Sequence, residues 1–172
     1  MVAPHKLHAF SLVEVVIAVG VFATAVAVTL SILPAMTRQM ADAGDALVAQ
    51  RIAGNLQVEL QRLAASGFDA LAAQPPVMAA PLVGGMEFVA TRDGLPLHSA
   101  TYLPPANPIA QSDQYFLIEV WQFNQAPLAY VATSAVLPLY VRVSWPYQNL
   151  GSAAPTALSD RRQLTFTISI NR

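Results

Sequence analysis

Glu14 is the acidic residue whose setting suggests chemistry, because it stands at the start of a long apolar segment. From Val15 to Thr37 the chain has 23 consecutive residues without a charge. A carboxylate at the centre of a membrane helix costs about 2.5 to 3.5 kcal/mol to insert, and the cost falls near the end of the helix. In the first helical turn the helix dipole also stabilises it. Glu14 is therefore either an interfacial charge or a group that awaits a cationic partner.

Few residues offer catalytic or metal chemistry. The chain has three histidines and no cysteine, which excludes a thiolate metal site and a disulfide framework. His5 and His8 precede the apolar segment, and His98 falls in an expected loop. Asp160 lies in the loop before the last expected strand. Calcium needs about six to eight oxygen ligands, and this single carboxylate does not supply them. We predict no catalytic residue, no metal site and no cofactor, and expect that the protein is not an enzyme.

The charge balance disfavours nucleic acid as a partner. Nine Lys and Arg residues stand against ten Asp and Glu residues, for a formal net charge of −1. Removal of the first nine residues, which include Lys6, would leave eight basic residues against ten acidic ones, a net charge of −2. A protein that binds DNA or RNA needs a basic surface, and this composition does not supply one.

The uncharged segment must be a helix if it crosses a membrane. At 1.5 Å per residue its helix is roughly 35 Å long, against about 30 Å for the hydrocarbon core of a bilayer. Its valines and alanines suit a strand or a helix in water, but only a helix satisfies its own backbone groups in lipid. We predict a single transmembrane helix.

Residues 9–15 read AFSLVEV, and with the uncharged tract that follows they resemble the cleavage and methylation motif of type IV prepilins and pseudopilins. In that family a prepilin peptidase cuts before the phenylalanine and methylates the new amino group. The resemblance implies cleavage between Ala9 and Phe10, N-methylation of Phe10, and a role for Glu14 in assembly. The family usually has glycine where this chain has Ala9, the next smallest residue.

The resemblance also implies partners and a location. The partners would be a prepilin peptidase, other pilin-like subunits in a filament, and membrane lipid. The chain would cross the inner membrane once, with its N-terminus in the cytoplasm and its C-terminal domain outside. The Leu33-Pro34 end of the tract and the alanine-rich helix resemble the Verru_Chthon cassette protein B group, and more distantly the minor pseudopilins of type II secretion.

A physical role for Glu14 follows from this resemblance. Cleavage would create an α-amino group on Phe10, and such a group is largely charged near neutrality because its reference pKa is about 7.7 to 8.0. Within one chain the two groups lie four residues apart along a helix, so their pairing requires strain. A neighbouring subunit can offer its amine instead. Two unit charges 4 Å apart attract by about 4 kcal/mol at an effective dielectric of 20, before desolvation.

Three other interpretations remain open. Ala25-Val26-Ala27 fits the cleavage site of an ordinary signal peptide, which would leave a chain that starts at Val28. The apolar tract continues past that site to Met36, which favours the prepilin interpretation. In the second interpretation the chain is a membrane-anchored binding protein that does not polymerise. In the third it is an exported enzyme. The scarcity of histidine and cysteine weighs against an enzyme.

The chain after the membrane segment is predicted to continue as an amphipathic helix to about Ala65. We expect a kink near Pro34 and a helix stop at Ser66-Gly67. One stripe of apolar residues at helical spacing should pack beneath a sheet: Ala49, Ile52, Leu56, Leu60 and Leu63.

The rest of the chain predicts an antiparallel sheet. Residues 69–85 read as a loop, and Asp93-Gly94 as a hairpin turn. Strands are expected at Met86–Thr91, Tyr115–Phe123, Leu128–Val136, Leu139–Trp145 and Gln163–Asn171. The fold class is α+β, with a long N-terminal helix, transmembrane in its first half, followed by an antiparallel sheet packed on the helix. The expected parts are a leader (1–9), a transmembrane half-helix (10–37), an amphipathic extracytoplasmic half-helix (38–66) and a loop-rich sheet head (67–172).

Overall fold

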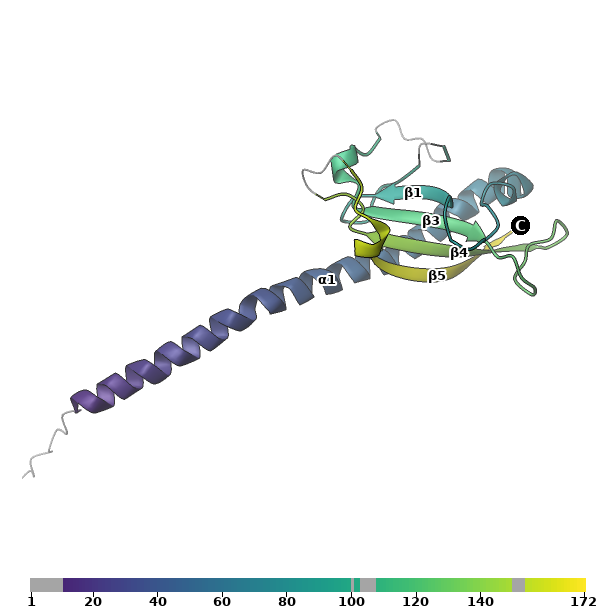
Figure 1. Ribbon diagram of the computed structural model, residues 1–172. Helices are drawn as coiled ribbons and strands as arrows, with labels where there is room; N and C mark the ends of the chain where they lie inside the picture. The colour runs from purple at the N-terminus through teal and green to yellow at the C-terminus, as the bar shows by residue number, and fades with distance from the viewer. Residues whose placement is uncertain (1–10, 100, 103–107, 150–153) are drawn as a thin grey trace, which may run out of the picture. The chain divides into compact units, whose positions relative to one another are not determined.

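The computed structural model describes residues 11–99, 101–102, 108–149 and 154–172. The chain divides into two compact units, Met1–Ala43 and Gly44–Arg172. One long helix, α1 (Leu12–Ala72), begins in the first unit and continues into the second. Five strands and two short 3-10 helices follow, so the fold is α+β as predicted (Figure 1).

The described part of the first unit is the apolar part of α1. Every residue from Ser11 to Ala41 is exposed within the chain. An 18-residue window of this helix has a mean hydropathy of 2.5 and none of it is buried, so by length and composition the helix can cross a membrane. A signal sequence near an N-terminus meets the same criterion. Pro34 lies inside the helix, where the backbone angles stay helical, and the predicted kink near it stays a prediction.

The helix breaks at Gly67, within the predicted stop at Ser66-Gly67. Gly67 is the residue within α1 whose backbone angles (φ 171°, ψ 87°) are not helical. A further helical turn follows this kink and ends at Ala72, so the loop predicted from residue 69 begins later. Phe68, Leu71 and Ala72 are buried in the core. Their burial explains why one more helical turn forms beyond a glycine that would ordinarily stop it.

The second unit contains one five-stranded antiparallel sheet in the order β2-β1-β3-β4-β5. Four strands confirm predicted segments, and a two-residue strand, β2, closes the hairpin at Asp93-Gly94. Gly94 has φ +84°, which favours glycine at this turn. The strand bounds are β1 (Met86–Ala90), β2 (Leu97–His98), β3 (Phe116–Gln122), β4 (Val136–Trp145) and β5 (Arg162–Asn171), and the 3-10 helices are η1 (Gln111–Asp113) and η2 (Leu158–Asp160).

The predicted strand Leu128–Val136 does not form. Its backbone bonds locally instead: the N–H groups of Leu128 and Ala129 donate to the carbonyl of Gln125, and Ser134 N–H donates to Val131. Only Val136 joins a strand, as the first residue of β4. Local turns satisfy this backbone because β4 already has β3 and β5 as its two neighbours.

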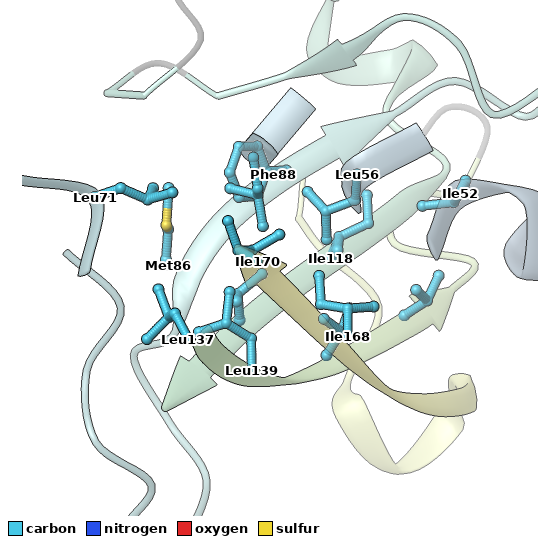
Figure 2. Packing of buried hydrophobic residues seen from close by; sticks show 14 of the residues in the cluster. Ile52, Leu56, Leu71, Met86, Phe88, Ile118, Leu137, Leu139, Ile168 and Ile170 are labelled. Atoms are coloured by element: carbon cyan, nitrogen blue, oxygen red, sulfur yellow. The ribbon is translucent and has the colours of Figure 1, made fainter. Parts of the chain in front are cut away.

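The core lies between the sheet and the part of α1 that belongs to the second unit. Figure 2 shows Ile52 and Leu56 of α1 among side chains of β1, β3, β4 and β5. Ala49, Ile52, Leu56 and Leu60 are fully buried, and Leu63 is half-buried. The predicted apolar stripe is therefore the core face of the helix. The strands contribute Phe88, Ile118, Leu137, Leu139, Ile168 and Ile170, among others.

Candidate assembly site at the start of the apolar helix

Ser11 and Glu14 form the described start of α1. The Glu14 N–H donates to the Ser11 side-chain Oγ at 3.2 Å and to the Ser11 carbonyl oxygen at 3.0 Å. Ser11 is thus the N-cap, and Glu14 is the third helical residue. Serine at the N-cap with glutamate three residues on is the sequence of a capping box. The serine satisfies one of the four N–H groups that a helix leaves unpaired at its start.

The Ser11 N-cap is the feature that the sequence analysis missed, although the Ser-x-x-Glu spacing that accompanies such caps is present in the chain. The interpretation of Glu14 rested on its charge and on the family motif. The Glu14 carboxylate lies in the first helical turn, where interaction with the helix dipole contributes about 0.3 to 1 kcal/mol.

No cation on the described helix lies near Glu14. The next charged residue along α1 is Arg38, 24 positions later, which is roughly 36 Å away along a helix. Among the residues that the structure describes, Glu14 takes part in no ion pair. Glu14 lies beside the uncharged segment and has no cationic partner on the described helix. Its carboxylate can therefore form an ion pair with a cationic group from elsewhere.

Ala9 and Phe10, where cleavage and N-methylation were predicted, lie outside the described residues. Cleavage before Phe10, N-methylation of Phe10 and its pairing with Glu14 stay predictions. His5 and His8 also lie outside the described residues.

The other candidate residues are in structural positions. His98 is buried on β2, so its predicted loop placement was wrong: the hairpin turns earlier and returns it to the sheet beside Val89. Asp160 is exposed in η2, where it accepts a hydrogen bond from the hydroxyl of Ser159 at 3.1 Å. Within the described ranges, no group of three His, Cys, Asp or Glu side chains is placed to hold a metal ion.

A charged cluster in the second unit joins α1 to the β1–β2 hairpin. Asp45 is buried, and it accepts hydrogen bonds from the hydroxyl of Tyr115 at 2.6 Å and from two guanidinium nitrogens of Arg92 at 3.2 Å. The Arg92 guanidinium also lies over the Tyr115 ring. The hydrogen bond with Asp45, and then the charge interaction with Tyr115, raise the pKa of Arg92. This cluster fixes the helix against the hairpin and has no group positioned for catalysis.

A second ion pair is buried on the face of the sheet that points away from α1. The Arg142 guanidinium lies 2.7 Å from the carboxylate of Glu119 and donates to the Leu82 carbonyl at 3.3 Å. Its guanidinium lies over the Trp121 ring. The loop between α1 and β1 covers this pair through Leu82. Both charges are satisfied within the protein, so the pair is a structural element.

Comparisons with known proteins give no match. No family model, no curated protein and no solved structure matches the chain.

Proposed function

We propose that the protein is a minor pilin or pseudopilin, a structural and assembly subunit of a type IV pilus-like or type II secretion filament that a prepilin peptidase processes. One observation carries the proposal: the motif glutamate lies in the first turn of α1, beside the exposed and uncharged segment 15–37, with no cation within reach on the described helix. The α+β fold, a long helix followed by an antiparallel sheet, agrees with what the motif implies.

Assembly would proceed through two complementary charges. Cleavage before Phe10 creates an amine that does not exist in the precursor, and the Glu14 carboxylate of a neighbouring subunit neutralises it. Before that encounter the helix dipole stabilises the carboxylate in the first turn, where Ser11 caps the Glu14 backbone N–H. Pairing then removes the cost of leaving an acid beside the apolar helices of a filament. The same uncharged helix anchors the unassembled subunit in the inner membrane, with the second unit outside the cytoplasm.

The proposal is tested with Glu14→Gln, which removes the charge and keeps the size and helix propensity of the side chain. In cells that assemble the filament, we expect normal membrane insertion and loss of incorporation into filaments. Ser11→Ala is the matched control, because it removes the cap and retains the acid; it should cost about 0.5 to 2 kcal/mol of local helix stability. Normal incorporation of the Glu14→Gln variant would contradict the proposal.

Mass analysis of the mature N-terminus tests the processing step separately. We expect a chain that begins with N-methylated Phe10. A chain that begins at Val28 would instead identify an ordinary signal peptide, and an unprocessed chain would identify a membrane-anchored protein that does not enter a filament.

A further inference from the structure

β5 is a long strand at the edge of the sheet. It pairs with β4 over ten consecutive residues, Arg162 to Asn171, with no interruption of the register. Within the described ranges, no other strand lies on its second side. From Gln163 to Asn171 the strand has neither a charge nor a proline. Edge strands of monomeric proteins usually carry a lysine, a proline or a bulge, which prevents another strand from pairing with them. The ladder of β5 shows none of these.

The last part of the edge is covered by side chains of α1. The Gln57 amide donates to the Ser169 carbonyl at 3.2 Å, and the Gln61 amide donates to the Asn171 carbonyl at 2.8 Å. The Asn171 N–H in turn donates to the Gln61 side-chain oxygen at 3.1 Å. Backbone groups that point away from β4 therefore belong to the odd-numbered residues of β5.

The first part of the edge has no such cover. By the same alternation, the N–H and C=O groups of Gln163, Thr165 and Thr167 point away from β4, and these three residues are exposed. Among the residues that the structure describes, no hydrogen bond is made to the backbone N–H or C=O groups of Thr165 and Thr167 outside the β4 ladder. The window for pairing is Gln163–Thr167, and it ends where the glutamines of α1 begin to cover the edge.

We propose that Gln163–Thr167 binds an extended strand of a different protein, which extends the sheet by backbone hydrogen bonds. Extended polypeptide is the ligand that matches alternating N–H and C=O groups along a strand. Leu164 and Phe166 are half-buried on the side that faces α1, and Thr165 and Thr167 lie on the opposite side. The bound strand should therefore be uncharged, with apolar side chains beside Leu164 and Phe166 and small polar ones on its other face.

A second copy of the chain does not suit this edge. Gln57 bonds to Ser169 and Gln61 bonds to Asn171, so β5 and the adjoining part of α1 run in the same direction. Two β5 edges related by a two-fold axis would pair antiparallel, and their α1 helices would then run in opposite directions. The two Gly44 residues, to which the apolar segments are attached, would then lie at opposite ends of the pair. Such a pair does not suit two chains whose apolar segments share one membrane, as the proposed function implies.

The test uses the full chain in detergent micelles and a synthetic probe, an acetylated and amidated peptide with the uncharged sequence of residues 163–171. A free peptide can adopt either direction, so it probes the edge without the constraint of a membrane. We expect the labelled peptide to bind, measured by fluorescence anisotropy, and to slow hydrogen exchange at the amides of Thr165 and Thr167. Two further probes carry N-methyl groups on one or the other set of alternate amides. Only one of the two should lose binding, because a strand uses alternate amides toward each neighbour.

The protein variant is Thr165→Pro, which removes one outward N–H and leaves the β4 ladder intact. It should weaken binding of the peptide about tenfold, equivalent to about 1.4 kcal/mol. Thr165→Val is the matched control, since it keeps the N–H, and it should bind the peptide normally. Absence of binding, or equal binding of both N-methylated probes, would overturn the proposal. Self-association of the purified chain that Thr165→Pro abolishes would overturn the assigned partner, because the edge would then bind a second copy. None of these outcomes depends on Glu14. The peptide-binding experiments therefore test the strand-binding edge independently of the Glu14→Gln test of the proposed function.

Discussion

The buried pair of Glu119 and Arg142 should be one of the most sensitive electrostatic contacts in the second unit. Their side chains are 7% and 8% exposed, and their charged atoms are 2.7 Å apart. Glu119→Ala leaves the guanidinium buried, with the Leu82 carbonyl and the face of Trp121 as its remaining partners. Loss of one member of a buried pair typically costs about 3 to 5 kcal/mol, because the other charge stays desolvated.

Urea denaturation of the full chain in micelles measures this cost. Trp121 and Trp145 are both buried, so their fluorescence reports the unfolding of the second unit. We expect a lower midpoint with an unchanged dependence on urea concentration, because the surface exposed on unfolding stays the same. The double variant Glu119→Leu with Arg142→Met should recover most of the loss, because apolar residues of similar size often replace a buried pair at little cost.

An exposed pair in the same unit provides the control. Arg62 and Glu59 lie 2.9 Å apart, and their side chains are 65% and 37% exposed. Glu59→Ala should cost less than about 1 kcal/mol, because water screens such a pair. If Glu119→Ala costs no more than this control, Arg142 finds water or another partner when its carboxylate is lost. The reasoning from burial would then be wrong.

Two further predictions concern packing and protonation. Leu56→Ala should lower the free energy of unfolding by about 2 to 5 kcal/mol, measured by the same urea assay, whereas Val58→Ala, at a site that is 68% exposed, should change it by less than about 0.5 kcal/mol. The hydroxyl of Thr91 donates a hydrogen bond to Asp93 and lowers the pKa of that carboxyl, so Asp93 contributes stability that is lost as pH falls through its lowered pKa. Thr91→Ala should raise the pKa of Asp93 toward its usual value, and an NMR titration of the Asp93 carboxyl carbon would show no change if the hydroxyl is not the cause.

Periodic patterns in the sequence predicted the main elements of the second unit. The apolar stripe of α1 and the alternation of β5 both correspond to the faces that are buried in the structure. These patterns succeed because burial acts on side chains at a fixed spacing along one element. The hairpin at Asp93-Gly94 was also predictable, since a glycine with positive φ marks the turn.

Contacts between distant segments were not predictable in this way. The helix continues past Gly67 because Phe68 and Leu71 pack in the core. Sequence rules for helix ends consider only neighbouring residues, so they do not predict this packing. The charged cluster of Asp45, Arg92 and Tyr115 joins three elements, and its members lie up to 70 residues apart in the chain. The candidate site is the opposite case: the Ser11 cap is a local feature that the Ser-x-x-Glu spacing predicts, and the interpretation from charge alone did not include it.

The bonds from Gln57 and Gln61 to β5 have a consequence for the time course of folding. They join residues 112 and 110 positions apart, and they involve the last strand of the chain. The strands β1, β3, β4 and β5 follow one another along the chain and can pair in that order, but the edge of the sheet beside α1 stays incomplete until the final residues emerge. During synthesis the part of α1 that bonds to β5 therefore stays uncovered until the final residues are made. Such long-range closure slows folding and exposes apolar surface for longer, so the incomplete chain would be a natural substrate for chaperones.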